Sequence, residues 1–169
     1  IKNIKNFYTK DSFNSSSFCR TVNNHHFKSL TYLLENPEKN GSKLISGGES
    51  NSKDNFIEPT IIENISSKSN IYNEEIFGPI LPVLSYEKIE DAISFINEKE
   101  KPLALYIFSK DNRSINKILN ETSSGGVCIN HNTLHYSNYN LPFGGINNSG
   151  FGRCHGEYGF RELSNKKSV

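Results

Sequence analysis

The sequence predicts an α/β fold in which helices flank a mostly parallel sheet. The first observation behind this prediction is that short apolar stretches, typical of strands, alternate with stretches whose apolar residues recur at helical spacing. The second is that these elements follow one another closely, as they do in the βαβ units that build parallel sheets. With 169 residues, the chain can bury one sizeable core.

The first half of the chain predicts two helices and then extended segments. Residues 1–8 have the apolar spacing of a short helix, and the serine- and asparagine-containing residues 11–17 predict a loop. Residues 25–36 predict an amphipathic helix that ends near Pro37. The stretches "SKLISGG" and "NFIEPTIIENI" predict strands, and Pro59 interrupts the second of them.

The second half repeats the alternation of strand and helix. Strands are predicted for "ILPVLSY", "PLALYIFSK" and "GGVCIN", and the helices "KIEDAISFINEKE" and "RSINKILNETS" lie between them in the sequence. The run "PLALYIFSK" is almost entirely apolar, which predicts a strand that is buried on both faces.

Residues 141–160, "LPFGGINNSGFGRCHGEYGF", combine many glycines with aromatic residues and have no clear hydrophobic period. So many glycines predict a loop that bends sharply or that lets another group approach the backbone closely. A phosphate cradle is the alternative, but the dinucleotide fingerprint requires a helix directly after the glycines, and no helical pattern follows. A loop that lines a pocket is therefore favoured, and residues 160–169 are expected to be extended and polar.

Charge and hydropathy argue against two classes of partner. The 19 basic and 18 acidic residues leave a net charge of +1, which gives no reason to expect nucleic acid or an anionic membrane. No apolar stretch approaches the roughly 18 residues of a membrane span, so no membrane segment is expected. The chain contains no methionine and begins with Ile1, so we expect it to be a fragment of a longer protein.

Cysteines and histidines show no metal-binding pattern, and we expect no metal site. The three cysteines are an odd number without CxxC spacing, which predicts buried or free thiols in a reducing compartment and hence a cytoplasmic protein. His131 and His135 are four residues apart, but the neighbouring strand and Pro142 argue against a helix that would bring them together.

Residues 74–79, "EEIFGP", place two carboxylates and an aromatic ring in front of a turn. Side chains alternate along an extended segment, so Glu74 and Glu75 point in opposite directions and an acid–base pair is not favoured. Glu75 and Phe77 share a face instead. A carboxylate and a ring on one face could hold a sugar diol together with a flat ring, or they could be a plain loop edge.

The ordered stretches "EEIFGPILPVLS", "PLALYIFS", "SSGGVCIN" and "LPFGGINNSGFGR" together resemble the C-terminal part of NAD(P)-dependent aldehyde dehydrogenases, in particular the class 3 and fatty aldehyde branch. Upstream, "FCRTVNNHHFKSL", "KLISGGES" and "FIEPTII" are similar to that family in order and spacing. The resemblance implies an incomplete aldehyde dehydrogenase fold. Residues 1–122 would be the C-terminal part of the catalytic domain. Residues 123–169 would be a strand, the glycine-rich pocket loop and a C-terminal oligomerisation segment.

The resemblance also implies roles for particular residues. Glu75 matches the glutamate that accepts hydrogen bonds from the nicotinamide ribose, and Phe77 matches the aromatic that packs near the nicotinamide ring. Phe143 resembles the pocket aromatic beside the reacting thiol, and His155 matches a residue of the class 3 substrate tunnel. Asn130 closes a strand, for which a structural role is expected.

The family's nucleophilic cysteine and general-base glutamate precede the matching region, so no catalytic residue is expected in this chain. Cys19, Cys128 and Cys154 lack the context of the nucleophile, and Cys154 stands where class 3 members have tyrosine. The resemblance implies oxidation of aldehydes to carboxylic acids with NAD or NADP by a full-length homodimer, and an inactive chain when alone. The alternative is a truncated, inactive remnant with a structural or subunit-binding role.

Overall fold

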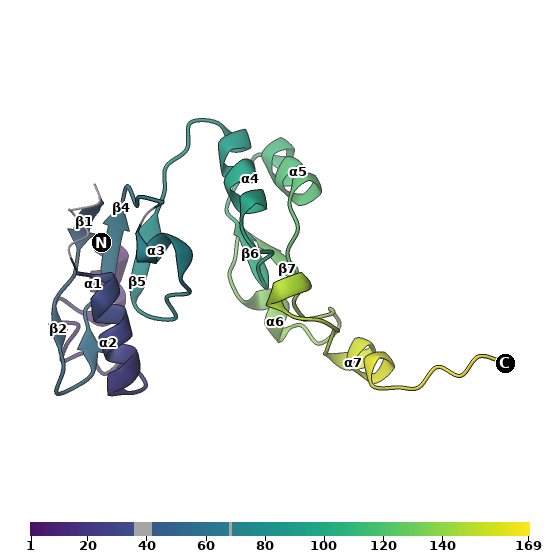
Figure 1. Cartoon of the computed structure of the whole chain (residues 1–169), viewed down its shortest axis with the longest axis horizontal. Coiled ribbons are helices and arrows are strands. Elements are labelled where there is room, and N and C mark those ends of the chain that lie inside the picture. Colours follow the sequence, from purple (N-terminus) through teal and green to yellow (C-terminus); the bar gives the residue numbers. More distant parts are fainter. Residues whose placement is uncertain (36–41, 68) are drawn as a thin grey trace. The chain divides into compact units, whose positions relative to one another are not determined.

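The computed structural model describes residues 1–35, 42–67 and 69–169. These residues form two compact units, Ile1–Ser85 and Tyr86–Val169, and each combines strands with helices (Figure 1). The predicted α/β class is therefore confirmed. The division predicted between residues 122 and 123 concerns the roles of the segments and stays a prediction.

The first unit contains two small sheets. The larger sheet has the strand order β1–β4–β5, with β1 antiparallel and β5 parallel to the central β4. The strands β2 and β3 form a separate antiparallel ribbon. The bounds are Lys43–Ser46 for β1, Ser50–Asn51 for β2, Phe56–Ile57 for β3, Thr60–Glu63 for β4 and Ile80–Val83 for β5. All of these strands except β2 lie within segments predicted to be extended, and Pro59 separates β3 from β4.

The helices of this unit are α1 (Lys2–Tyr8), α2 (Asn24–Leu33) and the short α3 (Asn70–Asn73), which the sequence pattern did not predict. Helix α2 begins where the side chain of Asn23 accepts a hydrogen bond from the backbone N–H of His26. Its predicted apolar face is confirmed, because it supplies three members of the buried core, which consists of Phe27, Leu30, Leu33, Ile57, Ile62, Ile65, Ile71 and Ile80. The helix ends at Leu33, and Pro37 lies outside the described residues.

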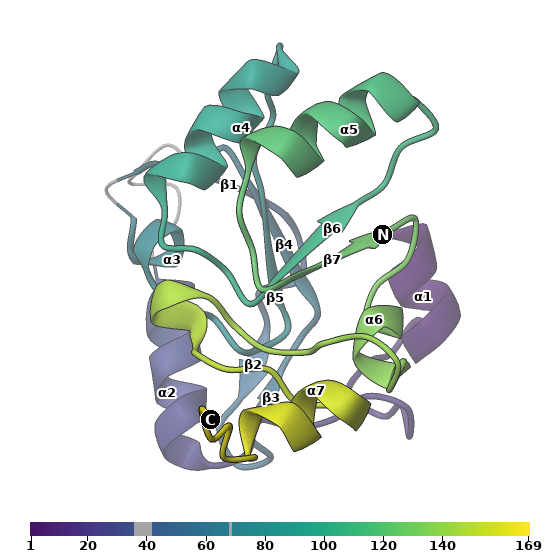
Figure 2. The same cartoon turned by 90° about the vertical axis from the view of Figure 1, so that its right-hand side faces the viewer.

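The second unit begins with a helix, α4, which is followed by a βαβ arrangement. Strands β6 (Ala104–Ile107) and β7 (Gly126–Ile129) pair in parallel, and α5 (Asn112–Glu121) connects them. Helix α5 lies beside α4 (Ile89–Glu98), as Figure 2 shows, and Lys117 of α5 forms an ion pair with Glu90 of α4 at 3.2 Å. Among the described residues, the β1–β4–β5 sheet is therefore mixed, whereas β6 and β7 pair only in parallel and β2 and β3 only antiparallel.

Strand β6 is not buried on both faces, contrary to the expectation for "PLALYIFSK". Ile107 is 5% exposed, whereas its neighbours Tyr106 and Phe108 are 41% and 68% exposed. Successive side chains of a strand point to opposite faces. The second unit thus covers one face of β6 and leaves the other accessible.

The C-terminal region is more helical than the sequence suggested. It contains α6 (Leu134–Ser137), a 3₁₀ turn (Asn147–Ser149) and α7 (Gly156–Glu162). The expectation of a loop followed by an extended tail was wrong for residues 156–162, because the left-handed conformations of His155 and Gly156 redirect the chain into α7. Within the described ranges, no helix is both long and apolar enough to cross a bilayer.

Candidate functional site

The turn between α3 and β5 carries the two residues predicted to bind a cofactor. Ile76 is half-buried and packs against the core of the first unit. Glu75 and Phe77, on either side of it, are both exposed, and Phe77 is 84% exposed. The alternation expected of an extended segment is not kept, because Glu74 and Glu75 are both exposed and Phe77 has a φ of 47°. Ile76 is the anchor of the turn, and a carboxylate and a ring are displayed to solvent.

The Glu75 carboxylate is available to a ligand. In the described part of the chain it takes part in no hydrogen bond or ion pair. The backbone N–H of its neighbour Glu74 bonds to the carbonyl of Asn70 at 3.0 Å and ends α3. A carboxylate accepts hydrogen bonds through both oxygens, so Glu75 can bind two donors of one ligand, such as the hydroxyls of a diol.

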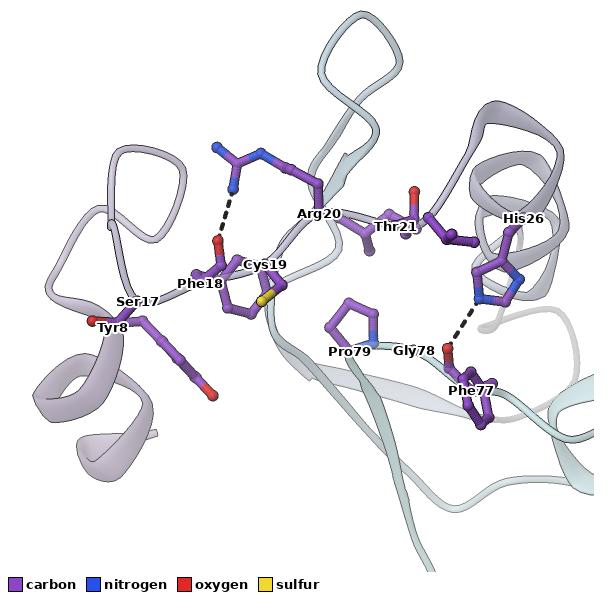
Figure 3. A pocket seen from close by; sticks show the side chains of 12 residues that line it. Tyr8, Ser17, Phe18, Cys19, Arg20, Thr21, His26, Phe77, Gly78 and Pro79 are labelled. Carbon is purple, nitrogen blue, oxygen red and sulfur yellow. Dashed lines mark hydrogen bonds between the residues drawn. The ribbon is translucent and has the colours of Figure 1, made fainter.

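His26, to which the sequence pattern assigned no role, contacts this turn. Its Nε2 lies 2.9 Å from the backbone oxygen of Phe77. In Figure 3 the Phe77 carbonyl points toward the imidazole and the phenyl ring points away from it. The two residues are 51 positions apart in the sequence, so no local pattern could have connected them.

The next residue of the turn, Gly78, is held against the same helix. A Cβ at this position would lie 2.5 Å from Cδ1 of Leu30, which is 1% exposed. Only glycine leaves room for this contact. Helix α2 therefore fixes two consecutive residues of the turn, one by a hydrogen bond and the other by close packing.

A pocket of about 380 Å³ lies beside the turn. Its walls come from α1, the segment before α2, the start of α2 and residues 77–79 (Figure 3). Arg20 supports one wall, because its guanidinium lies over the rings of Phe13 at 5.1 Å and Phe56 at 4.8 Å and donates hydrogen bonds to the carbonyls of Phe13 and Phe18. Aromatic, aliphatic and small polar side chains thus line the pocket together with Arg20.

The two residues predicted to line a substrate pocket meet in the second unit. The rings of Phe143 and His155 stack with centroids 5.5 Å apart and an interplanar angle of 19°. Two backbone hydrogen bonds between Phe143 and Cys154, at 3.1 and 2.8 Å, fix this arrangement. Three further rings complete what we call the aromatic cluster: His135, Tyr136 and Tyr139.

The glycine-rich loop also borders a cavity, of about 500 Å³, that includes Phe143, Phe151 and Arg153 in its lining. Its tight course depends on Gly145, where a Cβ would lie only 2.0 Å from the backbone oxygen of Ser149. This geometry agrees with the prediction of a tight loop that lines a pocket.

Asn130 has the structural contacts expected of it. Its side-chain amide accepts from the N–H of Ser109 and donates to the carbonyl of Ser109, both at 2.9 Å. These bonds join the ends of β6 and β7 and fix the start of the segment that leads to Phe143.

The described residues contain no group of three or more histidine, cysteine or acidic side chains that could hold a metal ion. His135 is in the short helix α6, whereas His131 precedes that helix. The three cysteines are free, with Cys19 and Cys154 exposed and Cys128 half-buried.

The structure thus brings together Glu75 with Phe77 in the first unit and Phe143 with His155 in the second. Sequence reasoning missed His26, Arg20 and the tyrosines of the aromatic cluster. The adjacent pair His25 and His26 in the first turn of α2, after the cap residue Asn23, was the available signal for the first of these.

Comparison with known proteins places these features in one family. Residues 2–169 match the family model described as "Aldehyde dehydrogenase family". Aldehyde dehydrogenase family 3 member A2 of Rattus norvegicus is 44% identical over 97% of this chain and 33% of its own length. The dimeric NADP-preferring aldehyde dehydrogenase of Bos taurus is 40% identical over 99% of this chain and 68% of its own length.

A solved structure of an aldehyde dehydrogenase is also similar to this chain. The substrate-bound state of Staphylococcus aureus AldH is 40% identical and superimposes with a TM-score of 0.91, covering 99% of this chain and 37% of its own. The chain therefore spans about a third of the length of the rat and staphylococcal proteins.

Proposed function

Because the chain belongs to the aldehyde dehydrogenase family, we propose that it is the nicotinamide-positioning and pocket-wall part of an NAD(P)-dependent enzyme that oxidises aldehydes to carboxylic acids. The observation that carries this proposal is the turn between α3 and β5, where an unpaired carboxylate and an exposed ring lie on either side of the half-buried anchor Ile76.

The chemistry of the turn fits the nicotinamide half of the cofactor. The Glu75 carboxylate can accept from both hydroxyls of the nicotinamide ribose, and charged acceptors form the stronger hydrogen bonds. The Phe77 ring offers a flat apolar surface to a flat ring. When bound, the cofactor supplies the acceptor for the hydride that leaves the substrate.

The contribution of this chain is positioning. Glu75 would fix the ribose, and Phe77 would limit the sideways motion of the ring attached to it, so that the reacting carbon stays at transfer distance. In the family the thiolate that attacks the aldehyde carbon, and the base that activates water to release the acid, precede the matching region. We therefore expect no turnover from residues 1–169 alone.

Phe143 and His155 would form part of the substrate pocket. Their stacked rings, supported by Tyr136 and Tyr139, present an aromatic wall that suits an apolar aldehyde. The bovine relative is named dimeric, and we propose a homodimer for the full-length protein as well. Either NAD or NADP serves as the cofactor in this proposal.

The test is Glu75→Gln in the full-length protein, with Glu74→Gln as the matched control. Glutamine keeps one acceptor oxygen but loses the charge, which weakens the ribose bonds by about 1–2 kcal/mol, equivalent to roughly fivefold to thirtyfold. We expect Glu75→Gln to raise the cofactor KM or slow hydride transfer by this factor, with the aldehyde KM little changed. Equal effects of the two variants on cofactor kinetics would refute the role of Glu75.

A further inference from the structure

Phe77 has an unusual backbone conformation for an aromatic residue. Its φ of 47° lies in the left-handed region, which costs a residue other than glycine of order 1–3 kcal/mol. The residue is 84% exposed, so packing of its side chain does not compensate for this conformation. Something outside the side chain of Phe77 must hold the turn in place.

The hydrogen bond from His26 is suited to that purpose. A carbonyl oxygen can only accept, so the Nε2 of His26, 2.9 Å away, must carry a proton and donate it. The imidazole itself is half-buried and stands on a rigid support, because Asn23 caps α2 through the backbone N–H of the same residue at 2.9 Å. The donor is therefore fixed before any ligand arrives.

We propose that His26 is a positioning residue. By binding the backbone carbonyl of Phe77, it holds this residue in the left-handed conformation and so sets the orientation of the Phe77 ring. This inference rests on the proposed function, since it assumes that Phe77 contacts the nicotinamide. His26 acts through the Phe77 backbone rather than by touching the cofactor. Gly78, packed on Leu30 one helical turn after His26, limits the motion of the turn on its other side.

The geometry also specifies which substitution preserves the function. Glutamine places an amide N–H as many bonds from Cβ as Nε2 of histidine, so His26→Gln can still donate to the Phe77 carbonyl. Asparagine is one bond shorter, and His26→Asn cannot reach. His25, next in sequence and exposed, provides the control His25→Asn.

The experiment uses the full-length protein with bound NADH or NADPH and no aldehyde. The fluorescence of the reduced nicotinamide reports the surroundings of its ring, and calorimetry gives the cofactor Kd. We expect His26→Asn to reduce the emission enhancement of the bound cofactor and to weaken Kd by roughly threefold to tenfold, as loss of one ordinary hydrogen bond implies. His26→Gln and His25→Asn should resemble the parent.

The variant Phe77→Leu distinguishes a failure of the proposed contact between Phe77 and the nicotinamide from a failure of the role proposed for His26. If Phe77→Leu leaves the emission unchanged, the ring does not contact the nicotinamide and the proposed function of Phe77 fails. If Phe77→Leu reduces the emission but His26→Asn does not, only the role of His26 is refuted. Should His26→Asn fail to fold, His26→Leu, which cannot donate, is compared with His26→Gln: lower emission in His26→Leu alone supports the proposal, and equal emission in the two variants overturns it.

Discussion

Gly78→Ala tests whether α2 fixes the cofactor turn by close packing. The added methyl group would lie 2.5 Å from Cδ1, 2.9 Å from Cδ2 and 3.3 Å from Cγ of Leu30, all shorter than ordinary carbon contacts. Leu30 is 1% exposed and surrounded by core residues, so it cannot move away without displacing them. Overpacking of this kind costs about 1–3 kcal/mol.

A double-mutant cycle shows whether this clash is the cause. Leu30→Ala alone should cost about 2–5 kcal/mol through the cavity that it creates. In Leu30→Ala/Gly78→Ala the new methyl group occupies part of that cavity, so the double variant should be more stable than the sum of the single effects predicts, by about 0.5–3 kcal/mol.

The assay is denaturant unfolding of the full-length protein, with Gly159→Ala as the control. In α7 a Cβ at position 159 would meet its nearest neighbour, Cα of Cys154, at an ordinary 3.4 Å, so this variant should be as stable as the parent or slightly more stable. Parent-like stability of Gly78→Ala, or strict additivity in the cycle, would refute the packing argument.

Two further predictions concern the second unit. Phe143→Ala removes the ring that stacks on His155 and should lower kcat/KM for aldehydes, unequally for short and long chains, with a loss of transition-state stabilisation of up to about 3 kcal/mol; identical profiles would make Phe143 a purely structural residue. Asp111, the N-cap of α5, has a pKa below its ordinary 3.8. The largest cause is the hydrogen bond from the Ser114 hydroxyl, followed by those from the backbone N–H groups of Arg113 and Ser114. The stabilisation by the ionised Asp111 is therefore complete above pH 3.8 and is lost as the pH falls through the lower native pKa. The free energy of unfolding should therefore fall less steeply with acid in Asp111→Asn than in the parent, and equal slopes in the two proteins would contradict this.

The elements that were predicted correctly are those whose pattern is local. The apolar face of α2 follows from the spacing of Phe27, Leu30 and Leu33, and helix α5 follows from the apolar period of the stretch "RSINKILNETS". Each of these patterns lies within a few residues, so the sequence alone contains it.

The features that were missed depend on contacts between distant segments. The bond from His26 joins residues 51 positions apart, and the aromatic cluster joins α6 to the strand-like pair of Phe143 and Cys154. Helix α7 escaped prediction because Gly156 and Gly159 are poor helix formers, so no local preference marks this helix. The exposed face of β6 was missed because an apolar run does not reveal which face the chain covers.

The central claim is that Glu75 and Phe77 hold the nicotinamide half of the cofactor. A crystal structure of the full-length protein with bound NAD or NADP tests it most directly. We predict that both hydroxyls of the nicotinamide ribose donate to the Glu75 carboxylate and that the nicotinamide ring packs against Phe77, whose carbonyl still accepts from His26. A well-ordered complex in which the nicotinamide ribose and ring contact neither Glu75 nor Phe77 would contradict this claim.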